Sequence, residues 1–241
     1  MDPRALSPFG AALKGYYTGD SEAVLAIRRD DGFEDPLPVQ HFFRPPAEFS
    51  KIESRALELC WGRVLDIGAG SGLHSLYLQS TGLEVTALDL DSSAVEVMSD
   101  RGVRDVRQAD IGEFVGGPYD SLLLLGHGVG MVEDLESLYR FLLDVLTITS
   151  PEAQILVHSR DVRITEDPSH LAYHKRNRRL GRYPGEVRLQ FEYQGVAGPL
   201  CGWLHVDPDT LANRATESGW NCDIILAGRD GEYPSRLTRR R

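Results

Sequence analysis

The sequence predicts a doubly wound α/β fold, a Rossmann-like sheet of about seven strands in which the last strand runs antiparallel. Two observations lead to this fold class. An apolar strand at residues 63–67 is followed by alternating glycines and then by apolar residues at helical spacing from Leu73. Further apolar segments of strand length recur along the chain between helical or loop segments, at residues 84–90, 103–109, 121–125 and 153–158.

The glycine loop indicates which kind of ligand the fold binds. Glycines occupy positions 68, 70 and 72, where a Cβ would obstruct the sharp turn or an approaching ligand. A dinucleotide-binding loop requires glycine at position 73, where this chain has leucine. Asp66, just before the loop, would repel a pyrophosphate but suits the amino group of an amino-acid-bearing ligand. A nicotinamide dinucleotide is therefore disfavoured.

The other segments surround this core, and we expect a single domain over residues 1–241. Ser50 and Glu53 have the spacing of a capping box, which predicts a helix over 50–60. Alternating residues at 186–193 and 200–206 predict a hairpin. The expected parts are an N-terminal helical cap at 1–60, a cofactor-binding core at 61–160, a lid or hairpin insertion at 161–206, and a last helix with closing strands at 207–241.

The segment Leu65-Asp-Ile-Gly-Ala-Gly-Ser-Gly72 resembles motif I of the class I S-adenosylmethionine-dependent methyltransferases. The resemblance extends over about residues 50–160, because acids follow three successive strands as they do in that family. It implies S-adenosylmethionine as cofactor and S-adenosylhomocysteine as product. It also implies that the residues after the fourth strand, Gly126 to Gly130, form a loop between cofactor and substrate.

The cofactor-binding residues follow from the strand ends and from this resemblance. Asp89 lies about 20 residues after the glycine loop, where the fold places an acid that accepts hydrogen bonds from both ribose hydroxyls. The resemblance places Asp110 on the adenine amino group and Ile111 on the ring. The predicted cofactor residues are Asp66, Gly68, Ala69, Gly70, Asp89, Leu90, Asp110, Ile111 and Gly126.

Methyl transfer is an in-line displacement in which the protein mainly orients the acceptor and excludes water, and a general base is needed only if the acceptor must lose a proton. His127 is the first candidate for a base or substrate contact because it follows the fourth strand, and His158 is the second. No metal site is predicted. The remaining substrate candidates are Phe43, Arg44, Arg160 and Tyr193.

The composition of the chain limits the classes of molecule that it could bind and the compartment in which it would work. A formal net charge of -10 disfavours a nucleic-acid-binding surface, although residues 173–182 are locally basic and read as a polar, solvated loop that contains His174. Three scattered cysteines suggest no disulfides or zinc site, and no signal peptide is evident, which favours the cytoplasm.

The sequence thus favours transfer of a methyl group to an N, O or C atom of a small-molecule acceptor, with no membrane partner. An RNA or protein methyltransferase and a non-catalytic cofactor-binding module remain as alternatives. Monomer and homodimer are both left open.

Overall fold

The computed structural model describes residues 1–228 and 230–240, so the end of the predicted closing segment, residue 241, lies outside the described residues. Its larger sheet has seven strands in the order β11-β12-β7-β6-β3-β4-β5. Strand β12 runs antiparallel to its neighbours β7 and β11, while the five strands from β7 to β5 are parallel. The predicted fold class is thereby confirmed. The strands are β3 (Arg63–Ile67), β4 (Glu84–Asp89), β5 (Asp105–Gln108), β6 (Tyr119–Leu124), β7 (Thr149–Arg160), β11 (Trp220–Ile224) and β12 (Glu232–Arg239).

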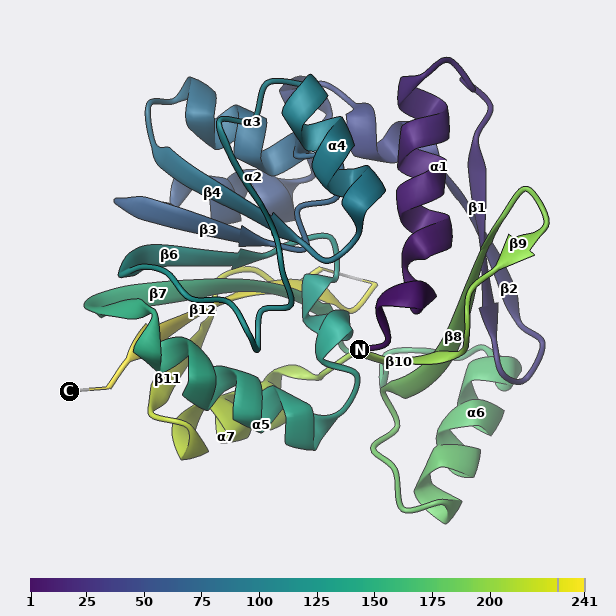
Figure 1. The fold of residues 1–241 in the computed structure, drawn as a ribbon. Helices are drawn as coiled ribbons and strands as arrows, with labels where there is room; N and C mark the ends of the chain where they lie inside the picture. Colours follow the sequence, from purple (N-terminus) through teal and green to yellow (C-terminus); the bar gives the residue numbers. More distant parts are fainter. Residues whose placement is uncertain (229, 241) are drawn as a thin grey trace.

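Helices cover both faces of this sheet (Figure 1). Because successive strand residues point to opposite faces, Leu122 and Leu124 pack with α5 and α7, whereas Leu123 packs with α2 and α3. The capping box of Ser50 and Glu53 is present at the start of α2. The helices of these layers are α2 (Lys51–Glu58), α3 (Leu73–Ser80), α4 (Ser92–Asp100), α5 (Leu135–Asp144) and α7 (Pro208–Glu217).

A second, smaller sheet combines two N-terminal strands with three strands from residues 186–204. Its order is β10-β8-β1-β2, and β9 also pairs with β8. The predicted hairpin is present, since β8 and β10 pair antiparallel, but β8 also pairs with the N-terminal strand β1. Residues 1–60, expected as a helical cap, therefore contribute two strands as well as helix. The strands are β1 (Val24–Arg29), β2 (Glu34–Pro38), β8 (Glu186–Tyr193), β9 (Val196–Ala197) and β10 (Cys201–Leu204).

Helix α1 (Ser7–Tyr17) lies between the two sheets (Figure 1). It packs against β8 on one side and α4 on the other. Its Gly10 is close to Asp91, the N-cap of α4, so that a Cβ at Gly10 would lie 1.8 Å from the Asp91 carboxylate. The side chains of Phe9 and Leu13 lie against Gly70. Helix α1 is thus part of the cover over the glycine loop.

Helix α6 (Pro168–Arg179) corrects the prediction of a solvated loop in this region. Asp167 accepts hydrogen bonds from the backbone of the first turn and Pro168 occupies the first helical position, which is a recognised helix start. Tyr173 and His174 are buried against the second sheet, and the Tyr173 hydroxyl donates to Asp30 at 2.8 Å. Within the described residues, none of the helices has both the length and the apolar character needed to span a bilayer.

Candidate functional site

The glycine loop after β3 is hydrogen-bonded to the end of the neighbouring strand β4. Gly68 and Gly70 have left-handed backbones, with φ of 70° and 57°. The Gly68 N–H donates to the Leu88 carbonyl at 2.8 Å, and the Gly70 N–H donates to Asp89 Oδ2 at 2.8 Å. Ala69, between them, also donates to the Leu88 carbonyl. The loop therefore presents its backbone beside the carboxyl end of β4.

Two buried carboxylates flank this loop. Asp66 accepts a hydrogen bond from the Ser75 hydroxyl at 2.6 Å, and burial raises its pKa. Asp89 also accepts the backbone N–H of Asp91 at 3.0 Å. Burial raises the pKa of Asp89 to about 6, although these backbone hydrogen bonds favour the charged form. Both side chains are less than 10% exposed.

The third acid lies after β5, one strand further along the sheet. Asp110 is half-buried and accepts the Gly112 N–H at 2.8 Å. Ile111 packs against the main hydrophobic core, and Leu90, at the end of β4, is half-buried. The three acids thus follow adjacent parallel strands at one edge of the sheet, as the sequence predicts.

The residues present fit the cofactor that the resemblance implies. Carboxylates at the ends of β3 and β4 can accept hydrogen bonds from an amino group and from ribose hydroxyls. A Cβ on Gly68 would lie 2.3 Å from the terminal carbon of Met131, so a side chain there would have to displace Met131 as well as adopt a left-handed backbone. Gly128 lies against the carbonyl of Ile67, the last residue of β3. The segment around His127 is therefore next to the glycine loop.

His127, His158 and Glu232 meet at this same edge of the sheet. His127 follows β6 and has a left-handed backbone with φ of 62°, which is uncommon for a residue with a side chain. His158 lies near the end of β7, and Glu232 begins β12. Glu232 Oε2 lies 2.5 Å from His158 Nε2 and 3.3 Å from His127 Nε2. The two predicted catalytic histidines therefore share one carboxylate oxygen.

His205 and Arg160 complete the histidine cluster, by which we mean His127, His158, His205, Arg160 and Glu232. The Arg160 Nε–H donates to the other Glu232 oxygen at 2.7 Å, and the His205 and His127 ring centroids are 5.6 Å apart. The Nδ1 atoms of all three histidines are buried and have no hydrogen-bond partner among the described residues. Three imidazole nitrogens are thus left without a protein partner.

Burial and the carboxylate set the charge of the histidine cluster. Burial lowers the pKa of His205 to about 3 and lowers that of His127, which keeps both imidazoles neutral near pH 7. Burial opposes ionisation of Glu232, but hydrogen bonds from His127 and His158 outweigh it and hold the pKa of Glu232 well below its usual value. The histidine cluster therefore contains an ionised carboxylate beside the neutral imidazoles of His127 and His205.

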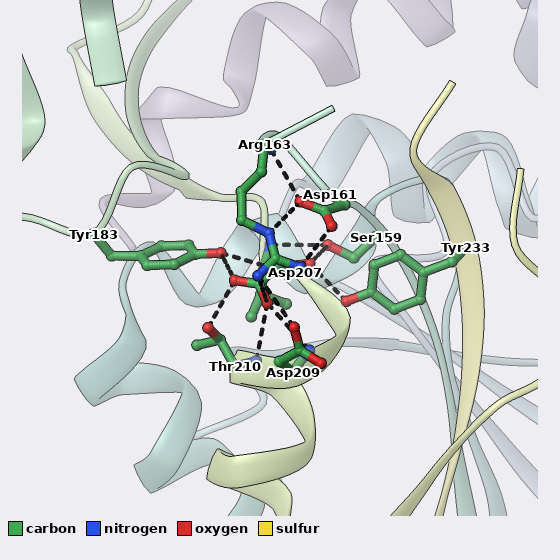
Figure 2. A network of polar contacts seen from close by, with 9 residues as sticks. Ser159, Asp161, Arg163, Tyr183, Asp207, Asp209, Thr210 and Tyr233 are labelled. Carbon is green, nitrogen blue, oxygen red and sulfur yellow. Dashed lines mark hydrogen bonds and ion pairs between the residues drawn. The ribbon is translucent and has the colours of Figure 1, made fainter. Parts of the chain in front are cut away.

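A second polar network, around Asp207 at the start of α7, includes residues next to the same strand ends (Figure 2). Asp207, the N-cap of α7, accepts hydrogen bonds from the Tyr183 hydroxyl at 2.5 Å and the Thr210 hydroxyl at 2.7 Å, and Arg163 reaches it at 3.1 Å. Ser159 and Tyr233 both donate to the carbonyl of Val206. Because Ser159 and Tyr233 follow His158 and Glu232 directly, this network fixes the backbone that carries the histidine cluster.

Except for Arg160, the other predicted substrate residues make contacts outside the histidine cluster. The Arg44 guanidinium binds the buried carboxylate of Glu53. The Tyr193 hydroxyl donates to Asp20 at 2.7 Å. Phe43 stacks on Tyr16 with ring centroids 4.7 Å apart, within the apolar cluster of the second sheet.

Sequence reasoning did not include Glu232 or His205 among the predicted site residues. Glu232 falls within the closing strands expected over residues 207–241. The antiparallel direction expected for the last strand could have revealed Glu232. The first residue of an antiparallel strand lies beside the carboxyl ends of the parallel strands, where the predicted site is. The register of β12 places Glu232 opposite Arg160.

Comparisons with known proteins agree with this geometry. A family model described as a methyltransferase domain matches residues 65–157. A crystal structure of a S-adenosylmethionine-dependent methyltransferase from Bacteroides fragilis, in complex with S-adenosyl-L-homocysteine, is 31% identical, with a TM-score of 0.86; the match covers 100% of this chain and 98% of that one.

Two matches to curated proteins are more local. Ubiquinone biosynthesis O-methyltransferase from Xanthomonas oryzae pv. oryzae is 36% identical over 93 residues, which is 38% of this chain and 37% of that protein. Protein-L-isoaspartate O-methyltransferase 1 from Rhodopseudomonas palustris is 35% identical over 130 residues, 48% of this chain and 52% of that protein. Given the full-length match to the Bacteroides protein, the chain belongs to the class I S-adenosylmethionine-dependent methyltransferases, enzymes whose cofactor is S-adenosylmethionine.

Proposed function

We propose that the protein transfers a methyl group to an N, O or C atom of a small-molecule acceptor bound at the histidine cluster. The observation that carries this proposal is the position of His127, which follows β6 beside the glycine loop and faces Glu232 and His158. S-adenosylmethionine supplies the methyl group from its sulfonium and leaves as S-adenosylhomocysteine.

The cofactor would be held along the edge formed by β3, β4 and β5. The loop Gly68–Gly70 and Gly126, which follows β6, would allow close backbone approach, and Asp66 would accept a hydrogen bond from the amino end of the ligand. Asp89 accepts the ribose hydroxyls, because its buried carboxylate is already fixed by two backbone N–H groups. Asp110 accepts the adenine amino group while Leu90 and Ile111 pack against the ligand.

The acceptor would be oriented by the histidine cluster. His127 has a left-handed backbone between two glycines, and its contact with Glu232 would orient its imidazole toward the acceptor. A neutral imidazole can contact an acceptor hydroxyl or amine and take the proton that it loses. Arg160 is paired with Glu232 but is about half exposed, so it remains able to contact an anionic group of the acceptor.

The second sheet supports a small acceptor rather than a nucleic acid or a protein. Strand β10 leads directly to His205, and its Trp203 lies against Gly130 of the segment Gly128–Val132 that follows His127. This arrangement covers the acceptor side and would help to exclude water from the reaction. The acidic net charge of -10 also disfavours a nucleic-acid substrate.

The first test is calorimetric binding of S-adenosylmethionine and S-adenosylhomocysteine, with NAD as the control. Binding of both sulfur compounds without NAD is expected. Binding of NAD alone would overturn the assignment of the acids.

Acceptors would then be screened by transfer of labelled methyl from S-adenosylmethionine to phenols, amino sugars, carboxylic acids, a peptide pool and an RNA pool. The variant His127→Asn suits this assay because asparagine tolerates a left-handed backbone. We expect it to lower turnover by about a hundredfold, the range for a lost acid–base group, with little change in cofactor affinity. His170→Asn, on helix α6, is the matched control. Equal loss of turnover and cofactor affinity in His127→Asn would contradict its role, and labelling of peptide or RNA alone would contradict the small-molecule acceptor.

A further inference from the structure

The histidine cluster contains more potential metal ligands than methyl transfer requires. His127, His158 and Glu232 each offer one ligand atom, and these three atoms all lie within 4.8 Å of one another. The residues come from three separate elements, the segment after β6, the end of β7 and the start of β12. Three donors brought together from distant parts of the chain form a compact set, in which His158 is only 8% exposed.

The donor types favour a transition metal over a hard cation. Two imidazoles and one carboxylate suit zinc, iron and related divalent ions, whereas magnesium and calcium prefer sites made almost entirely of oxygen. Arg160 occupies one oxygen of Glu232 and leaves the other directed at the histidines. The hydrogen bond from Arg160 to Glu232 is the kind of contact that orients a carboxylate for metal binding.

The unpartnered nitrogens form an independent observation. Buried polar atoms are nearly always hydrogen-bonded, and exceptions call for an explanation. Within the described residues, buried side-chain atoms without a partner are few, and His127 Nδ1, His158 Nδ1 and His205 Nδ1 are among them and belong to one group of rings. A purely structural cluster would be expected to satisfy these atoms from the neighbouring backbone. Because His127 and His158 face Glu232 through Nε2, their Nδ1 atoms keep a free lone pair in the neutral imidazole and are available to a ligand from outside the chain.

We propose that His127, His158 and Glu232 bind a divalent transition-metal ion of the zinc class at the acceptor side of the cofactor site, with His205 alongside. A bound ion would activate an acceptor oxygen or nitrogen by making it lose its proton more readily. With the ion bound, His127 and His158 would act as ligands, and the acceptor proton would go to solvent instead of to the His127 imidazole. This differs from the sequence-based expectation of no metal, because Glu232 could not be placed beside the histidines from sequence.

The test uses cobalt as a spectroscopic probe of the full-length protein, with no His tag. Chelator-treated protein is titrated with Co²⁺ at pH 7.5, and the visible absorption of low-coordinate cobalt is followed, then displaced with Zn²⁺. Metal content is also measured on protein purified without chelator. We expect about one equivalent of cobalt, displaced by about one equivalent of zinc. This readout requires neither the cofactor nor an acceptor, so its outcome is independent of the proposed methyl transfer.

Variants assign the ligands. His158→Ala and Glu232→Gln should each weaken cobalt binding by about tenfold or more, the lower end of effects seen for changes around metal sites. His127→Asn provides a third variant that keeps the backbone conformation if either of the others fails to fold. His170→Asn removes an imidazole from helix α6 and should bind as the wild type does. Absence of cobalt absorption and of bound metal in folded wild-type protein would overturn the proposal, as would equal weakening in His170→Asn.

Discussion

Asp89 should make cofactor binding depend on pH. Burial raises its pKa to about 6, so the carboxylate that we propose as the acceptor of the ribose hydroxyls is ionised at pH 7 but about nine-tenths protonated at pH 5. Because the ionised form is the better acceptor, affinity for S-adenosylhomocysteine should fall about tenfold between pH 7 and pH 5, equivalent to about 1.4 kcal/mol. Calorimetric titrations over this range measure the effect directly.

The same shift has an opposite effect on the stability of the free protein. A carboxyl whose folded-state pKa lies above its unfolded value binds protons more tightly when folded, so the free energy of unfolding decreases as pH rises from about 4 to about 6. For a displacement of about two pKa units the loss is on the order of 3 kcal/mol. Asp89→Asn should remove this component of the pH dependence of urea unfolding and also flatten the affinity profile. A wild-type affinity that stays constant from pH 7 to pH 5, or an Asp89→Asn profile identical to the wild type, would refute the reasoning.

Three further predictions concern residues that shape the site. Gly70→Val should weaken cofactor binding by about tenfold or more because valine resists the left-handed backbone at φ 57°; circular dichroism should show a retained fold, since a Cβ there meets only ordinary contacts. Asp207→Ala should lower the free energy of unfolding by about 2–4 kcal/mol, because α7 loses its N-cap and the half-buried Tyr183 hydroxyl loses its acceptor. Urea unfolding measures this, and a loss under 1 kcal/mol would count against the network. Gly130→Ala should destabilise the protein by about 1–3 kcal/mol, since its Cβ would lie 2.1 Å from the Trp203 ring. Tryptophan fluorescence should shift as well. Unchanged fluorescence and an unchanged melting temperature would show that Trp203 moves aside freely.

The cofactor core was predictable because its signals are local. The strand, the three glycines and the following helix lie within about 20 residues, and the capping box of Ser50 and Glu53 requires only four. Asp89 and Asp110 could be placed because parallel strands bring their carboxyl ends to one edge. Each of these inferences needs only the strand order of a familiar fold.

The second sheet, which covers the acceptor side of the site, and the histidine cluster were less predictable because both depend on pairing between strands that are far apart in the sequence. Strand β1 pairs with β8, with Ile27 opposite Phe191, and nothing in either segment specifies that partner. His158 and Glu232 are 74 residues apart and meet only because β12 returns against β7. Helix α6 was missed for a different reason, since its buried face carries Tyr173, His174 and Asn177 rather than an apolar stripe.

The interleaved second sheet limits how this protein could be recombined with its relatives. The cofactor core matched by the family model is one continuous stretch of the sequence. The second sheet, in contrast, contains strands from before that stretch and strands from after it. Replacing residues 186–204 alone would leave the new β8 beside an unrelated β1, with mismatched side chains on both faces of the pair. A chimera designed to change the acceptor must therefore exchange the N-terminal hairpin and the later hairpin together.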